Sequence, residues 1–334
     1  MATMKEIAEA AGVSQATVSR VINDGPKVGN ATRERVKQII EDLNYRPNAN
    51  ARALATNRNN AVGVVLADLY EPFFATLAHG VDLVARENGS QILISGGSVG
   101  METERKAIET LLEHRCDAMV VHSKSLPDEF LISLTRTIPG LVLINRYIPA
   151  IGNRCVWLDN RAGGQLMADY MIRQGHRKFA IISSDFSIDD PVDRISGIRD
   201  SLAAANIDLP EINVEYGAPS PEGGEAATQN LLSKGADFTA ILAYNDAMAS
   251  GAMTMLMDHN INVPNDVSVI GYDDILLAKY CRPKLTTLRY PIELMASKAT
   301  RLALSYAAGT PPTEDTTYKF QATVVKRGSV SHFE

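Results

Sequence analysis

The chain has 334 residues, of which 45% are hydrophobic and 22% charged, and its formal net charge is −6. This length provides for two or three domains with cores of their own, and the composition is typical of a soluble globular protein. No apolar run approaches the length of a membrane span or a secretion signal, and the three cysteines lie too far apart for a metal or disulfide motif. We therefore expect a cytoplasmic protein with no membrane contact, no metal and no cofactor.

Charge is unevenly distributed along the chain. Residues 1–60 contain nine Lys and Arg against six Asp and Glu, a net charge of +3, which leaves −9 for residues 61–334. A basic head on an acidic body favours a head that binds a polyanion such as nucleic acid. A charge of +3 over this length is also ordinary variation, so the charge alone leaves both interpretations open.

Helix signals divide the head into three helices. Thr3 and Glu6 form a capping-box pattern that begins the first helix, and Gly12 ends it. Ser14 can cap a second helix of about eight residues, and a third helix is expected over about 32–44. Two helices joined by a short turn, with a third in support, predict an all-α helix-turn-helix head.

The second of these helices has a lean outer surface of small and hydroxyl side chains. Val18, Val21 and Ile22 form its apolar face, and the opposite face carries one long basic side chain, Arg20. A recognition helix must enter a DNA groove about 12 Å wide, which excludes bulk on its outer face. The residues predicted to read base edges are Gln15, Ala16 and Arg20, and those predicted to contact the DNA backbone are Thr3, Ser14, Thr17, Ser19, Asn23 and Tyr45. The alternative is a generic surface helix with a good cap.

The segment YRPNANARALATNRN, residues 45–59, follows the head. Pro47 disfavours helix immediately before it, and Asn48 can cap a short Ala-rich helix that runs through Ala55. Leu54 is the only large apolar side chain of this helix. Two interpretations stay open: a helical spacer that docks through Leu54, or a hinge that folds on DNA and inserts Leu54 into the minor groove.

The body alternates short apolar runs with helical patterns. AVGVVLADL, residues 61–69, is a near-continuous apolar run, as expected of a strand that is buried on both faces. The further strand candidates are 91–97, 117–123, 140–145, 155–160, 178–184, 212–218, 238–245, 266–274, 285–290 and 317–327. This alternation predicts an α/β fold of two lobes, each a doubly wound parallel sheet, joined by several short crossings.

Polar residues gather at the carboxyl ends of these strands, where ligands of open α/β sheets bind. The set is Asp68, His122, Asn145, Arg146, Asp159, Asn245 and Asp273. Flanked by Phe73 and Phe74, it suits a ligand with an apolar face and several hydroxyls, although strand ends also reach water and His122 by itself is typical of a structural histidine. Arg194 falls in the first turn of a helix expected over 193–202, so it either reaches into the cleft or forms a surface ion pair with Asp190 or Asp193.

The first 60 residues resemble the LacI/GalR family of bacterial repressors through MKEIAEAAGVSQATVSRVIN and YRPNANARALA. The body resembles the effector domain of the same family, a periplasmic-binding-protein-like fold, and is most similar to its galactose-responsive members through HRCDAMVVHSK, LVLINRYIPAIGNRC, YNDAMASGAM and RPKLTTLRYPI. The resemblance implies a homodimer on a near-palindromic double-stranded operator, with hinge contacts in the minor groove by Asn48, Ala51 and Leu54. It also implies sugar-hydroxyl contacts by Asn145, Arg194, Asn245 and Asp273, with Phe73 in the cleft wall. The strand-end pattern adds His122 to these predicted effector contacts.

The function implied by this resemblance is repression of sugar transport and catabolism genes, released when a sugar, D-galactose, binds between the lobes. Another sugar or a purine-like corepressor is the alternative effector. The expected domains are a head over 1–46, a hinge over 47–59 and an effector domain over 60–334. One lobe is expected at about 60–160 and 291–318, and the other at about 161–290 and 319–330. No leucine heptad follows the last strand, so a tetramer through a C-terminal coiled coil is not expected.

Two rival classes are a sugar-acting enzyme and a transport binding protein. The pairs Asp273–Asp274 and Asp189–Asp190 are candidate catalytic carboxylates, but Asp273 and Asp274 are expected as strand neighbours that point to opposite faces. No hydrolase, phosphate-loop or metalloprotease motif is present. A transport protein would need export and would not need the head. We therefore expect a DNA-binding regulator and no enzyme.

Overall fold

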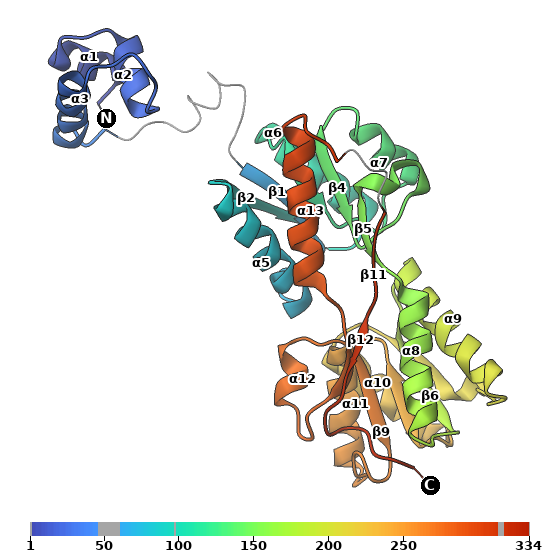
Figure 1. Cartoon of the computed structure of the whole chain (residues 1–334). Helices are drawn as coiled ribbons and strands as arrows, with labels where there is room; N and C mark the ends of the chain where they lie inside the picture. The colour runs from blue at the N-terminus through green and yellow to red at the C-terminus, as the bar shows by residue number, and fades with distance from the viewer. Residues whose placement is uncertain (1, 46–60, 97, 313–316, 334) are drawn as a thin grey trace. The chain divides into compact units, whose positions relative to one another are not determined.

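The computed structural model describes residues 2–45, 61–96, 98–312 and 317–333 (Figure 1). The chain divides into two compact units, a head within residues 1–59 and a body over residues 60–334, and each is described by itself. The predicted minor-groove residues Asn48, Ala51 and Leu54 lie outside the described residues.

Three helices build the head: α1 (Met4–Ala11), α2 (Gln15–Ile22) and α3 (Asn30–Asp42). The Thr3 hydroxyl accepts the backbone N–H of Glu6 while the Glu6 carboxylate accepts that of Thr3, so the predicted capping box is confirmed. Gly12 ends α1 at a left-handed φ of 61°, a conformation that glycine adopts without steric cost. The core of the head consists of Ile7, Ala8, Ala11, Val18, Val21 and Val36.

The third helix differs from its prediction at both ends. It begins at Asn30 and ends at Asp42, two residues earlier at each end than the predicted 32–44. Leu43, an apolar residue within the predicted range, is 41% exposed. It is the C-cap residue of α3, beyond the last turn that packs on the other two helices, so its side chain leaves the buried face.

The first lobe, called here the N-lobe, is a six-stranded parallel sheet in the order β11-β5-β4-β3-β1-β2. Its strands are β1 (Ala61–Leu66), β2 (Gln91–Gly96), β3 (Ala118–Val121), β4 (Gly140–Ile144), β5 (Cys155–Leu158) and β11 (Tyr318–Phe320). Helices α5 (Pro72–Glu87) and α13 (Ile292–Ala307) pack side by side on one face, as Figure 1 shows. The other face is covered by α6 (Met101–Glu113) and α7 (Asp128–Leu134), and the 3₁₀ helix η1 (Pro149–Arg154) precedes β5.

The second lobe, the C-lobe, is a six-stranded sheet in the order β12-β10-β9-β8-β6-β7, parallel except that β12 runs antiparallel to β10. Its strands are β6 (Phe179–Ser184), β7 (Val214–Gly217), β8 (Ala240–Ala243), β9 (Ser268–Asp273), β10 (Thr286–Arg289) and β12 (Thr323–Val325). Helices α8 (Asn160–Arg173) and α9 (Asp189–Ala204) cover one face. Helices α10 (Pro221–Ser233), α11 (Asp246–Asp258) and α12 (Leu276–Tyr280) belong to the other, and the 3₁₀ helix η2 (Glu211–Asn213) precedes β7.

The chain passes between the lobes three times, after β5, after β10 and between β11 and β12. Residues 317–327, expected as one strand, therefore form two short strands in different sheets, because the chain leaves one sheet after Phe320 and joins the other at Thr323. β11 also extends two residues past the expected lobe boundary at 318. One apolar core cluster includes residues of both lobes, so the two sheets share buried surface at these crossings.

Within the described part of the chain, we find no helix with the length and apolar character that crossing a membrane requires.

Candidate functional site

The head presents α2 as its candidate DNA-contacting surface. Val18 and Val21 are buried against the other helices, whereas Gln15, Ala16 and Arg20 are exposed, as the helical period predicts. A groove-entering helix needs this arrangement, with short side chains at its N-terminal end where base edges are contacted. The base-reading assignment stays a prediction.

Two of the hydroxyls expected to contact phosphates also hold helix ends. The Ser14 hydroxyl accepts the backbone N–H of Thr17 at 3.2 Å and is hydrogen-bonded to the Thr17 hydroxyl at 3.0 Å. Thr3 forms the capping box of α1. The amide of Asn23 donates to the Ser19 carbonyl at 2.9 Å, and Tyr45 is half-buried against the core of the head. These groups are held in fixed positions, a requirement for contacts that set the register of a helix on DNA.

The body contains a cavity of about 830 Å³ between the carboxyl ends of strands from both lobes. This volume falls in the range of small-molecule sites, about 300–1,000 Å³. All six predicted effector residues line it: Phe73, His122, Asn145, Arg194, Asn245 and Asp273. Asp68 and Phe74 line it as well. Arg146 and Asp159 do not line it, because Arg146 is paired with Asp128 and Asp159 caps α8 and is paired with Lys319.

Arg194 is held rigidly on the C-lobe wall of this cavity. Its guanidinium stacks 3.7 Å from the centre of the Tyr272 ring and lies 4.6 Å from that of Tyr244. The Nε–H donates to Asn160 at 2.9 Å, one Nη donates to the Tyr244 carbonyl at 2.6 Å, and the other lies 3.9 Å from the Asp273 carboxylate. A cation stacked and hydrogen-bonded in this way keeps one fixed orientation, which suits it to recognise hydroxyl oxygens.

The expected reason for the reach of Arg194 into the cleft is wrong. Helix α9 begins at Asp189, not near Asp193, so Arg194 lies in its second turn, beyond the strongest dipole effect. Asp189 and Asp190 are favourable at a helix N-terminus, and Pro191 is tolerated in the first turn, so the helix begins earlier. No described hydrogen bond links Arg194 to Asp193 or Asp190, and the surface ion-pair alternative does not hold.

Strained backbone marks two predicted contact residues. Asn145 has a φ of 59° and Asp273 a φ of 106°, both at the carboxyl end of a strand. Non-glycine residues in this region are uncommon and cluster at functional sites, where strain aims a side chain. Asn245 instead has extended backbone and caps α11, since its side-chain oxygen accepts the N–H of Met248 at 2.9 Å. Its amide nitrogen donates to the Pro219 carbonyl at 3.2 Å.

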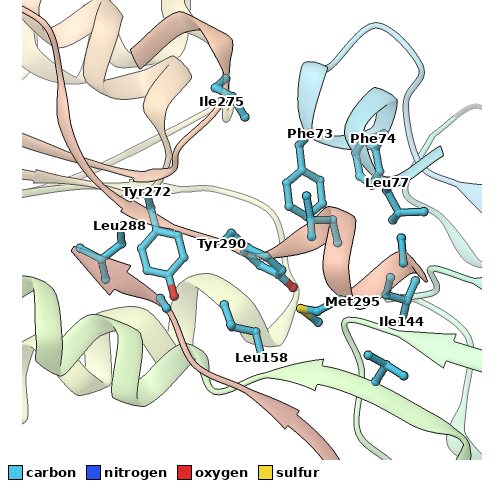
Figure 2. Close-up of a cluster of buried hydrophobic side chains, with 14 of the residues drawn as sticks. Phe73, Phe74, Leu77, Ile144, Leu158, Tyr272, Ile275, Leu288, Tyr290 and Met295 are labelled. Atoms are coloured by element: carbon cyan, nitrogen blue, oxygen red, sulfur yellow. The ribbon is translucent and has the colours of Figure 1, made fainter. Parts of the chain in front are cut away.

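Aromatic rings form the apolar wall of the cavity. Phe73, on α5, packs edge-to-face on Tyr290 with ring centres 5.0 Å apart, and Figure 2 shows the two rings side by side. His122 packs edge-to-face on Phe74 at 5.1 Å. Burial, reinforced by nearby Lys124, lowers the pKa of His122 to about 4, so the imidazole is neutral at pH 7. A neutral ring can both donate and accept a hydrogen bond, as a hydroxyl partner requires.

Acidic side chains shape the electrostatics of the cavity. Burial, with Asp68 close by, raises the pKa of Glu71 to about 7. Burial also raises the pKa of Asp273 well above its usual range, although Arg194 opposes this. Asp190 behaves differently, because Lys124 and Arg194 outweigh the burial that opposes its ionisation and hold its pKa below the usual value.

Several lining residues escaped the sequence-based prediction. Lys124 and Asp190 form an ion pair across the cavity, Tyr244 follows β8, and Tyr290 lies where the chain crosses after β10. Lys124 comes two residues after His122, a predicted strand-end residue. A prediction that included the first few residues after each strand would have contained it. Asp190 was expected only as a surface partner of Arg194 or as half of a carboxylate pair, and nothing local marks Tyr290, because the place of both in the site depends on how the lobes meet.

The candidate catalytic carboxylates do not face one bond, but alternation along a strand is not the reason, because Asp273 ends β9 with a positive φ and Asp274 lies beyond the strand. Asp273 lines the cavity, whereas its neighbour Asp274 accepts from Arg289 at 2.8 Å and from Arg327. Asp190 is buried and Asp189 exposed, so this pair does not flank one bond either. Among the described residues, no group of three or more His, Cys, Asp or Glu is arranged to hold a metal ion.

Comparison with known proteins now identifies the family. A family model described as "Bacterial regulatory proteins, lacI family" matches residues 3–48, and one described as "Periplasmic binding protein-like domain" matches residues 168–330. HTH-type transcriptional regulator GalR of Escherichia coli is 47% identical over 331 residues, which cover 99% of this chain and 96% of that protein. HTH-type transcriptional regulator GalS of Salmonella typhimurium is 44% identical over 99% of this chain and 97% of its own. The chain belongs to the lacI family of bacterial regulatory proteins.

Solved structures of the family share this fold. The lac repressor dimer bound to operator and the anti-inducer ONPF matches with a TM-score of 0.88 at 26% identity over 99% of both chains. A complex of the transcriptional regulator CelR with cellobiose matches with a TM-score of 0.71 at 31% identity, over 98% of this chain and 100% of that one. The predicted family, the two-part fold and the predicted class, a DNA-binding transcriptional regulator and not an enzyme, are confirmed.

Proposed function

We propose that this lacI-family regulator is a homodimeric repressor of galactose transport and catabolism genes, released from a near-palindromic operator by D-galactose. The observation that carries the proposal is the likeness to GalR and GalS over nearly the whole chain. A cavity with aromatic and polar walls from both lobes supports a small polyhydroxylated ligand. The proposed place of action is operator DNA in the cytoplasmic nucleoid.

The proposed division of labour follows the two units. The head, over 1–46, reads base edges with Gln15, Ala16 and Arg20, while the hinge over 47–59 enters the minor groove. The effector domain over 60–334 binds the sugar. Hydroxyl groups would meet Asn145, Arg194, Asn245, Asp273 and His122, and Phe73 would contact the apolar face of the sugar ring.

Linkage decides how the sugar can act. The sugar releases the operator only if it binds the operator-free arrangement more tightly, and DNA must then weaken sugar binding by the same factor. A ligand that tightens operator binding would have the opposite preference and would be a corepressor.

The test is operator binding at one fixed salt concentration, with and without galactose, beside glucose, ribose and hypoxanthine. Salt is held constant because phosphate contacts make affinity strongly salt-dependent. Release by galactose alone supports the proposal, whereas tightening by hypoxanthine overturns both the effector and the sign of the response. In the same assay, Asp273→Asn should abolish release and keep operator affinity, because the side chain, only 9% exposed in the cavity wall, loses an acceptor oxygen. Asp189→Asn, at an exposed position of the same lobe, is the matched control.

A further inference from the structure

A buried ion pair joins the two lobes across the cavity. Lys124 follows β3 of the N-lobe, and Asp190 lies in the first turn of α9 in the C-lobe. The Lys124 Nζ is 2.6 Å from the Asp190 Oδ1, and the two side chains are only 7% and 8% exposed. Charges this deeply buried are costly unless they are paired and hydrogen-bonded, so the contact fixes both partners.

Amide and phenol groups complete the hydrogen bonds of this pair. Asn145 of the N-lobe donates to the second oxygen of Asp190 at 3.0 Å, and Asn160 of the C-lobe donates to the first at 3.1 Å. Lys124 also donates to the backbone carbonyl of Asn145, and the Tyr290 hydroxyl donates to the Asn145 side-chain oxygen. We call this set the inter-lobe clasp: Lys124, Asn145, Asn160, Asp190 and Tyr290.

The N-lobe end of the clasp is rigidly mounted. Glu104 of α6 is buried at 6% exposure and its carboxylate accepts the Ser123 hydroxyl at 2.6 Å. The same carboxylate accepts the backbone N–H groups of the three following residues at 3.1–3.2 Å. A loop tied by four donors to one helix cannot move by itself, so displacing Lys124 from Asp190 requires the lobe as a whole to move.

We propose that Lys124 and Asp190 are positioning residues that set the angle between the lobes and couple occupancy of the cavity to operator binding. Both side chains also line the cavity, so a ligand hydroxyl that bonds to Asp190 or Lys124 competes with the clasp or adds to it. The sugar thereby acts on the contact that joins the lobes. The coupling part of this proposal rests on the proposed function, and the part that concerns the lobe angle does not.

The test uses Lys124→Gln, Asp190→Asn and the double variant in the full chain. Each single variant leaves one charge buried without its partner, while the double variant replaces both by amides that can hydrogen-bond to each other and so protects against misfolding. The matched control is Lys178→Gln with Asp237→Asn. That pair also has an N–O distance of 2.6 Å, but it is 58% and 73% exposed and lies within the C-lobe.

Two measurements are made on each variant. The first is the operator dissociation constant with and without saturating galactose, whose ratio is the coupling. The second is hydrogen exchange of the Asp159 and Tyr290 amides, which donate to Phe320 and Asp273 where the chain crosses between lobes. We expect the coupling to fall about tenfold in each single variant; such couplings are themselves typically about 5–150-fold. We also expect the two amides to exchange faster. The loss of coupling in the double variant should be smaller than the product of the losses in the two single variants. The control variant should have the same coupling as the parent.

The outcomes separate the two proposals. Coupling within twofold of the parent in both single variants, or single effects that multiply in the double variant, overturns the coupling role of the pair. If no sugar alters operator binding by the parent chain, the proposed function fails. Hydrogen exchange at the two crossing amides then still tests whether the clasp sets the angle between the lobes. Unchanged exchange in both single variants overturns that role.

Discussion

Replacing Asp246 by Asn should make the protein more stable at high pH and little different at low pH. Asp246 begins α11 and is fully buried, next to the effector-cavity residue Asn245. Its carboxylate accepts the Thr287 hydroxyl at 2.5 Å and the backbone N–H of Ile275 at 2.9 Å. Burial outweighs these hydrogen bonds and raises the pKa from 3.8 to about 7.

The sign of the pH effect follows from this raised value. A carboxyl whose pKa is higher in the folded chain contributes its full stability below the unfolded value of 3.8 and loses it as the pH rises through about 7. A shift of about three units amounts to about 4 kcal/mol in all, of which about 2–3 kcal/mol falls between pH 5 and pH 8. Asn carries no charge and therefore has no desolvation cost of this kind. It loses the favourable interaction of a carboxylate with the helix dipole, which is only about 0.3–1 kcal/mol.

The assay is urea unfolding of the parent and of Asp246→Asn at several pH values from 5 to 8, followed by far-UV circular dichroism. The difference in free energy of unfolding should move in favour of the variant by about 2–3 kcal/mol over this range. Asp189→Asn, at an exposed position in the first turn of α9, isolates the loss of a carboxylate at a helix N-terminus without burial. A difference that stays constant with pH, or an Asn variant less stable than the parent at pH 8, would refute the reasoning.

Three further substitutions test other parts of the molecule. Gln15→Ala should weaken binding by about 1–3 kcal/mol only for operators with the preferred outer bases, which competition between base-substituted operators measures; an unchanged preference contradicts the base contact. Leu54→Ala should reduce specific binding far more than non-specific binding at the same salt concentration, and equal losses reject the minor-groove wedge. Arg194→Lys keeps the charge but loses the stacking on Tyr272 and the Nε bond to Asn160, so it should lower the free energy of unfolding by about 2–3 kcal/mol. Urea unfolding checks this last value, and a loss below about 0.5 kcal/mol counts against a rigidly held guanidinium.

Local signals were sufficient for most of the head. The capping box at Thr3, the left-handed Gly12 and the Ser14 cap each act within four residues, so a linear reading places α1 and α2. The same approach was less exact for α3, whose N-cap Gly29 has no capping side chain and whose final apolar residue, Leu43, lies beyond the packed turn.

The body was predictable as strands and helices, and its site only in part. Parallel strands end on one edge of a sheet, so strand-end residues such as His122, Asn145 and Asp273 could be assigned to a common cavity without knowledge of the tertiary structure. Arg146 and Asp159 satisfy the same rule but have other partners, which no pattern along the chain reveals.

The sequence by itself determined the family, the two-part fold and the class of function, because these depend on periodic patterns and on a long ordered resemblance. Only the tertiary structure decided how the site is held together. Lys124 and Asp190 are 66 positions apart, and Tyr290 is 145 positions from Asn145. Their contacts exist because three crossings bring two separately wound sheets together. The free energy of such contacts depends on burial and geometry, which patterns along the chain do not reveal.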